Sequence, residues 1–333
     1  MREMIPTPNR RDILKTASAM AAAIAAGTFP LANAHAEDAP KPADAPKPAD
    51  SPKPADAPKP EDAHKPEDAP KPKKVLFFTK SSGFEHPVIH RAKPDELSFA
   101  ERALIEMGKK IGCDIAATKD GGYFTPDRLA PFDAVVFYTT GDLTTPGTDK
   151  QPPMPKEGVD TLVKWLEAGK GFFGLHSADD TFLTPDNGPV HPYLKLVGGE
   201  FNKHGSPQNA KIIAADKNFA PIKDLADFEL VEEWYKVKNL SPDLHVILVQ
   251  DTQSMSDPLY RMLKPYPQTW ARTQGTGRVF YTSMGHREEV WKSPVFEKIV
   301  LGGLAWVTGT IDADVKPNLK EVAPGAEELL RKN

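Results

Sequence analysis

The sequence contains a single cysteine, Cys113, among 333 residues. One thiol allows no internal disulfide, and it excludes zinc, haem c and iron–sulfur sites that are built from several cysteines. The sequence also lacks a Walker motif, a dinucleotide-type glycine motif and the Gly-x-Ser-x-Gly nucleophile elbow. Beyond the first 36 residues no apolar run is long enough to span a bilayer. Because the formal net charge is −4 and no Lys/Arg cluster stands out, we do not expect nucleic-acid binding.

The first 36 residues have the three parts of an export signal. Arg10 and Arg11 form a twin-arginine pair, residues 17–31 are apolar, and Ala34 and Ala36 place small residues where a signal peptidase cleaves. This order is typical of a Tat-type signal peptide, so we expect residues 1–36 to be removed and the chain to reach the periplasm or another compartment outside the cytoplasm. A retained membrane anchor is the alternative, which the short, alanine-rich apolar stretch disfavours.

Residues 37–73 repeat proline, lysine, alanine and aspartate, a composition typical of a linker. Proline fixes φ and removes backbone donors, and the opposite charges nearly cancel, so this segment cannot bury a core. We expect an extended polyproline II spacer. Residues 74–311 suit one large domain, and residues 312–333 form a polar C-terminal tail.

Short apolar runs bounded by turn residues predict an α/β domain. The first four expected strands are separated by helix-length crossovers, including a helix from about Asp95, which favours a parallel sheet with helices on both faces. Later strands follow one another more closely, so we expect them to extend the sheet in antiparallel fashion, before a final helix that ends at Gly309. The expected strands are 74–79, 114–118, 133–139, 172–175, 211–215, 228–237, 245–250, 268–272 and 278–282.

The apolar run from Phe172 to Leu175 follows the breaker Gly169-Lys-Gly171 and stops abruptly at His176. A continuous apolar run of this kind is typical of a strand buried on both faces of a parallel sheet. Polar residues at the carboxyl end of such a strand lie in the crevice where open α/β sheets bind ligands. We therefore expect His176 at the functional site, with Ser177 beside it and Asp179 either orienting it or capping the next turn.

Four of the nine histidines share this kind of position. His86 follows the first expected strand and His176 the fourth, whereas His204 and His286 lie in glycine-containing loops. Histidines gathered on one rim suit a divalent metal ion such as zinc, or acid–base chemistry near neutral pH. No HExxH spacing marks a metal site directly, and a lone histidine beside a strand end is usually a hydrogen-bonded structural residue, so both interpretations remain open.

Two adjacent acids, Glu232 and Glu233, stand in an expected strand that is otherwise largely apolar. Burying a carboxylate is costly unless it has a partner. One of the two should therefore face a metal ion or a histidine. The alternative is an edge strand with one acid facing water.

Seven motifs occur in order over the domain, and they are specific jointly rather than singly. They are Phe84-x-His86, Phe124-Thr-x-x-x-Leu129, Gly171-Phe-Phe-Gly-Leu-His-Ser-Ala178, Val197-Gly-Gly-x-Phe201-x-x-His204, Glu232-Glu-Trp-Tyr235, Gly277-Arg-Val-Phe-Tyr281 and Gly285-His286. Together they resemble the ThuA-like (trehalose utilisation) family. Trp234 stands where leucine is more usual, a conservative departure.

The resemblance implies a flavodoxin-like, class I glutamine amidotransferase-like fold. In true amidotransferases the corresponding turn carries a cysteine nucleophile, whereas this chain has His176 there, and Cys113 opens a strand far from that turn. Residue type therefore excludes glutaminase chemistry by a thiolate. His286-Arg-Glu288 resembles the later His-x-Glu of amidotransferases, which by analogy places His286 near His176.

The resemblance also implies carbohydrate metabolism, because such proteins occur with sugar oxidoreductases in routes through 3-keto-disaccharides. We expect a small-molecule sugar ligand and an exported protein that acts on a glycoside, keto-glycoside or disaccharide by acid–base or metal-assisted chemistry. A non-catalytic sugar-binding or envelope-associated module is the alternative. The expected roles are catalytic for His176, Glu233 and His286, substrate-binding for Ser177, Asp179 and Tyr235, and metal-binding for His86, His204 and His286.

Overall fold

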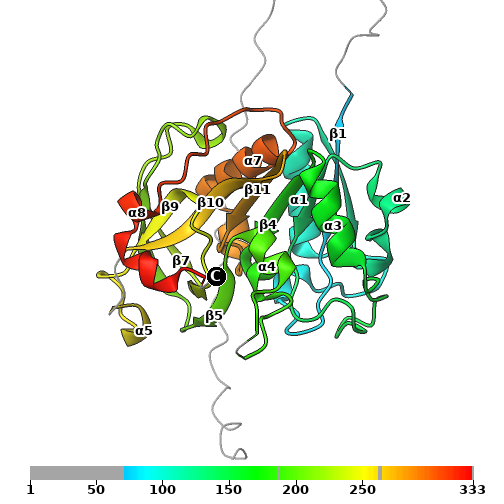
Figure 1. Cartoon of the computed structure of the whole chain (residues 1–333), viewed down its shortest axis with the longest axis horizontal. Helices are drawn as coiled ribbons and strands as arrows, with labels where there is room; N and C mark the ends of the chain where they lie inside the picture. Colours follow the sequence, from blue (N-terminus) through cyan, green and yellow to red (C-terminus); the bar gives the residue numbers. More distant parts are fainter. Residues whose placement is uncertain (1–70, 187, 262–264, 332–333) are drawn as a thin grey trace, which may run out of the picture. The chain divides into compact units, whose positions relative to one another are not determined.

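A nine-stranded sheet organises the part of the chain that this computed structural model describes, which is residues 71–186, 188–261 and 265–331. The predicted signal peptide and most of the predicted linker lie outside these ranges. The sheet order is β2-β1-β3-β4-β11-β10-β9-β6-β7, parallel as far as β11 and antiparallel beyond it (Figure 1). Its strands are β1 (Lys73–Phe78), β2 (Cys113–Thr118), β3 (Ala134–Phe137), β4 (Gly171–Leu175), β6 (Gln208–Ala214), β7 (Phe228–Glu232), β9 (His245–Asp251), β10 (Tyr266–Gln274) and β11 (Gly277–Thr282). The predicted α/β fold with an antiparallel extension is confirmed.

Helices cover both faces of this sheet, as the crossover lengths predicted. The α-helices are α1 (Phe99–Lys109), α2 (Pro126–Leu129), α3 (Gly158–Glu167), α4 (Pro192–Val197), α5 (Pro258–Arg261), α6 (Glu288–Trp291), α7 (Pro294–Val307) and α8 (Leu319–Val322). Short 3₁₀ turns are η1 (Pro87–Ile89), η2 (Gly121–Tyr123), η3 (His176–Asp180), η4 (Ala220–Ile222) and η5 (Pro324–Leu329). No helix within the described ranges is long and apolar enough to cross a membrane.

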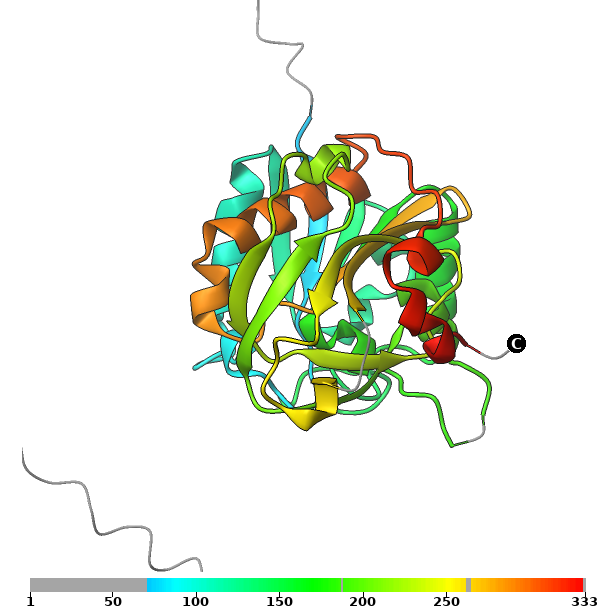
Figure 2. The ribbon, with the colours of Figure 1, turned by 90° about the vertical axis from the view of Figure 1, so that its left-hand side faces the viewer.

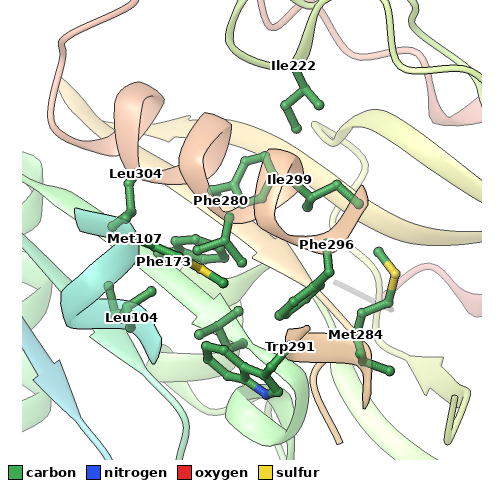
Figure 3. Close-up of a cluster of buried hydrophobic side chains, with 14 of the residues drawn as sticks. Leu104, Met107, Phe173, Ile222, Phe280, Met284, Trp291, Phe296, Ile299 and Leu304 are labelled. Carbon is green, nitrogen blue, oxygen red and sulfur yellow. The ribbon is translucent and has the colours of Figure 1, made fainter. Parts of the chain in front are cut away.

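Side chains of the central strands alternate between two hydrophobic clusters, one on each face. In β1, Val75 and Phe77 pack in the cluster that α1 and α7 cover, whereas Leu76 and Phe78 pack in the cluster with α3 and α4. Figure 2 shows α7 beside α1 on one face, with α8 on the other side of the sheet. In Figure 3, side chains of α7 lie over Phe173 of β4. The ring centroid of Phe173 is 4.9 Å from that of Phe280 on β11. Each such buried aromatic stabilises the fold by about 1.5–3 kcal/mol.

The first helix starts later than the expected position near Asp95. It begins at Phe99 because Ser98 caps it: the Ser98 hydroxyl accepts the backbone N–H of Glu101, and the Glu101 side chain accepts the backbone N–H of Ser98. This reciprocal capping box satisfies two donors that a helix N-terminus otherwise leaves unpaired. Glu101 also binds Arg91 through both carboxylate oxygens, at 2.8–3.1 Å.

The expected strand 228–237 is instead two strands with a break at Glu233 and Trp234, so this prediction was wrong. The first part, β7, ends at Glu232 on the edge of the large sheet, and the second, β8 (Tyr235–Lys238), pairs with β5 (Glu200–His204) in a separate two-stranded sheet. The sequence analysis did not anticipate β5. The break turns the chain away from the sheet edge and releases Glu233 from strand pairing.

The polar tail of residues 312–333 packs on the sheet as far as the structure describes it, to residue 331. Leu319 of α8 and Ala323 are buried in the same cluster as α3 and α4. The side chain of Asn318 bonds to both backbone polar groups of Val246. Its oxygen accepts the Val246 N–H, and its amide nitrogen donates to the Val246 carbonyl. These contacts tie the tail to β9.

Candidate metal centre

Three loops at the carboxyl edge of the parallel strands each bring one histidine to a common point. His86 follows β1, His176 follows β4 and His286 follows β11. Because these strands run parallel within one sheet, their carboxyl ends open on the same edge. Glu233 approaches the same point from the break between β7 and β8.

The four side chains converge closely enough to hold one metal ion. Each of His86, His176, His286 and Glu233 offers a ligand atom, and these atoms all lie within 4.8 Å of one another. Three of these atoms form a tight triangle. His286 Nδ1 lies 3.2 Å from both His176 Nε2 and Glu233 Oε2, and the latter two atoms are 3.5 Å apart. Ligands of a tetrahedral zinc ion, each at about 2.1 Å, are roughly 3.4 Å apart. The triangle therefore has the size of one face of such a site.

His176 is held in the orientation that a ligand needs. Its backbone φ is 45°, a left-handed conformation that is unusual for a residue with a side chain, and Tyr281 Oη donates to its carbonyl at 2.8 Å. Because the Ser283 carbonyl can only accept, His176 Nδ1 donates the hydrogen bond of 2.7 Å between them. In the neutral ring Nε2 then carries the free lone pair, directed at the other ligands.

A buried carboxylate positions the loop that carries His286. Glu232 Oε2 accepts the backbone N–H groups of Gly285 and His286, at 2.8 and 3.1 Å, and Glu232 Oε1 accepts that of Glu233. Tyr138 and Trp291 donate to the Gly285 carbonyl from the other side. Gly285 has φ 127°, a backbone conformation that favours glycine. Glu232 thus links the backbone of Glu233 to that of Gly285 and His286 without being one of the four converging side chains.

Charge at the centre is shared between one acid and one histidine. Burial opposes the ionised form of Glu233, but the adjacent imidazoles of His176 and His286 hold the pKa of this carboxyl well below its usual range. Burial likewise lowers the pKa of His286, but Glu233 more than compensates and the pKa is raised overall. Burial, followed by the neighbouring His176 and His286, lowers the pKa of His86 to about 2, so His86 stays neutral. Once a metal ion displaces the proton of His286, one anionic oxygen and three neutral imidazoles form a donor set suited to zinc or a similar divalent ion.

The other predicted site residues lie outside the group of four converging side chains. His204 is outside the cluster, but its Nδ1 lies 3.2 Å from Glu233 Oε1, and its side chain is 42% exposed. The Tyr235 ring packs 4.3 Å from the His176 ring and is nearly buried, so it braces the histidine. Ser177 is buried, with its hydroxyl 3.5 Å from His86 Nδ1.

Asp179 faces the protein interior rather than this centre. It is fully buried, and neither of its carboxyl oxygens has a hydrogen-bond partner in the described part of the chain. Burial raises its pKa well above the usual range, which favours the uncharged form of the group. A substrate-binding role for Asp179 would require this interior to open.

Sequence reasoning overlooked two features of the site. Ser283 orients His176 through its backbone carbonyl, which no side-chain motif can reveal. Phe84 is 63% exposed, although it is aromatic, and its ring lies 5.0 Å from that of His86. An exposed aromatic so close to a functional histidine was detectable only as part of the Phe84-x-His86 motif.

Comparison with known proteins agrees with this architecture. A family model described as ThuA, trehalose utilisation, matches residues 74–307. A ThuA-like protein from Parabacteroides merdae is 16% identical with a TM-score of 0.55, over 72% of this chain and 91% of its own. Another from Bacteroides uniformis is 18% identical with a TM-score of 0.52, over 79% of this chain and 100% of its own. None of the curated proteins searched matches the sequence.

Proposed function

The chain belongs to the ThuA family, described as trehalose utilisation, and from this premise we propose that it uses a divalent metal ion to act on a sugar. The convergence of His86, His176, His286 and Glu233 within 4.8 Å carries the proposal. The substrate class is a glycoside, a keto-glycoside or a disaccharide. A divalent ion held here would polarise a carbonyl or hydroxyl oxygen of the sugar.

The chain's own residues supply the remaining chemistry. Glu233 stays ionised and balances the positive charge of the centre, while His176 is fixed by Ser283. His204 contacts Glu233 and reaches solvent, so it is placed to pass protons between the centre and bulk water. The side chain of His286 is 20% exposed, which leaves the centre accessible to a ligand.

A chelator-sensitive reaction tests this function. The purified protein should convert a 3-keto-disaccharide or a related glycoside, chelation should abolish turnover, and zinc or another divalent ion should restore it. Product formation is followed by chromatography. Turnover that is unaffected after verified metal removal would favour acid–base chemistry by the same residues. Sugar binding without turnover on any glycoside would support a non-catalytic sugar-binding module instead.

We also propose that the protein is exported, on the basis of Arg10, Arg11 and the apolar segment after them. Replacing both arginines by lysine should keep the chain in the cytoplasm, because the Tat pathway requires the arginine pair. Immunoblots of cell fractions measure this. Equal amounts of wild type and variant outside the cytoplasm would contradict it.

A further inference from the structure

A cleft lies beside the chain segment that follows the turn η3, which begins at His176. Its volume is about 530 Å³, and Phe182, Leu183, Asp142, Asp160 and His191 are among its lining residues. The Proposed function leaves this cleft without a role. We propose that it binds a neutral sugar ring, as a second subsite beside the metal centre.

The cleft combines an apolar surface with well-placed polar atoms. Phe182 has φ 54°, an unusual conformation for a bulky residue, and its ring stacks on His191 with a centroid separation of 4.9 Å and an interplanar angle of 11°. Leu183 is 46% exposed at the same place. A sugar presents C–H groups on its ring faces and hydroxyls at its edge, so a site of this kind can bind both.

Donors and acceptors in the cleft are available for sugar hydroxyls. His191 Nδ1 accepts the backbone N–H of Tyr193 at 3.3 Å, so the proton of the neutral ring lies on Nε2 and can be donated to a ligand. Asp142 uses Oδ1 to accept from Thr144, and its Oδ2 has no hydrogen bond within the described residues. The carboxylate of Asp160 has no partner in that same part of the chain. Unpaired carboxylates are strong acceptors for hydroxyl groups.

The charge of the cleft favours a neutral ligand over an anion. Asp142 and Asp160 are countered there by one lysine, Lys156. The lining therefore has a net negative charge, which repels phosphate and carboxylate groups. A purely apolar ligand would strip water from the two carboxylates without replacing their hydrogen bonds.

Shared loops connect the cleft to the metal centre. The turn η3 starts at His176, and only five residues lie between His176 and Phe182, so the two are at most roughly 20 Å apart. Gly141, which also lines the cleft, donates to the Asp180 carbonyl at 2.9 Å and accepts from the Phe182 N–H at 3.1 Å. The neighbouring Thr140 donates to the carbonyl of Phe84, the exposed aromatic beside His86. These hydrogen bonds connect the loop that lines the cleft to the loops that carry His86 and His176.

The inference rests on the Proposed function for its ligand class. It is tested by measuring how tightly the metal-loaded full chain binds trehalose, a neutral disaccharide. Calorimetry should show that Asp142→Ala and Asp160→Ala each weaken binding about tenfold or more, because a hydrogen bond to a charged group is lost. Asp127→Ala is the matched control: Asp127 lies in the first turn of α2 as Asp160 lies in that of α3, but outside the cleft. Its affinity for trehalose should equal that of wild type.

Three outcomes would overturn the cleft as a sugar subsite: no trehalose binding by wild type, unchanged affinity in both cleft variants, or tighter binding of glucose 6-phosphate than of trehalose. The His286→Ala variant separates this inference from the Proposed function. If that variant binds trehalose while the cleft variants do not, the cleft is supported whatever the metal does. If it loses trehalose binding while the cleft variants keep it, the sugar binds at the metal centre, so the cleft inference fails and the Proposed function stands.

Discussion

Purified wild-type protein should retain close to one zinc or similar divalent ion per chain, and His286→Ala should retain almost none. His286 Nδ1 lies 3.2 Å from both His176 Nε2 and Glu233 Oε2, closer than those two atoms are to each other. Losing an outer hydrogen-bond partner of a ligand typically weakens metal binding 10–100-fold, and losing the ligand itself should cost roughly 100-fold or more. Elemental analysis gives the stoichiometry, and competition with a chromophoric chelator gives the affinity.

Two histidine variants serve as controls for this experiment. His204→Ala removes an imidazole that contacts Glu233 but is not among the four converging side chains, so it should weaken metal binding by about 10–100-fold at most, less than His286→Ala does. His90→Ala removes an exposed imidazole that binds Glu85, and metal content should not change. A metal-free wild type, or an undiminished ion in His286→Ala, would contradict the assignment.

The same titration should show stronger binding as the pH rises. A protonated imidazole cannot bind a metal, and the pKa of His286 is raised by Glu233 above its ordinary value. Below that pKa the ion must displace a proton, and above it the nitrogen is free. His86, with its pKa lowered to about 2, contributes no dependence in this range. Affinity should therefore fall as the pH decreases through the pKa of His286, with proton release on metal uptake.

The sequence was sufficient to predict that His86 and His176 lie on one rim of the sheet, but not which atoms meet there. A buried apolar run that ends at His176 is a local pattern, and the rule that parallel strands open on one edge brings His86 to the same rim. The close spacing of the strands that became β10 and β11 and the apolar pattern of the final helix are equally local. The fold therefore followed from patterns that each strand or helix carries within itself.

The remaining features depend on partners distant in the sequence. The acid pair was correctly expected to need a partner, but the strand break after Glu232 was not foreseen, because its cause is a carboxylate that reaches the Gly285 and His286 N–H groups more than 50 residues away. His204 was expected among the metal ligands because it shares a loop context with the others. Its position on β5, a strand that was not expected, leaves it beside Glu233 and outside the four.

Glu232→Ala should be among the most destabilising single substitutions near the site, lowering the free energy of unfolding by about 3 kcal/mol. The carboxylate is fully buried and accepts three backbone N–H groups, from Glu233, Gly285 and His286. Removing it leaves these donors unpaired in the interior, each at a cost of about 1–3 kcal/mol. Burial already raises the pKa of Glu232, so relief of that cost offsets part of the loss. Urea unfolding followed by tryptophan fluorescence measures the difference.

Glu232→Gln separates the positioning role of this side chain from simple packing. The glutamine has nearly the same shape but only one acceptor oxygen, so it should recover about half of the lost stability and part of the metal affinity. Glu229→Ala provides the matched control, because Glu229 is an exposed residue of the same strand that binds Asn209, and such pairs contribute about 1 kcal/mol or less. If Glu232→Ala binds zinc as tightly as wild type, the His286 loop does not depend on this carboxylate. If metal affinity and stability instead fall together and glutamine restores both in part, Glu232 is the residue that holds Gly285 and His286 at the centre.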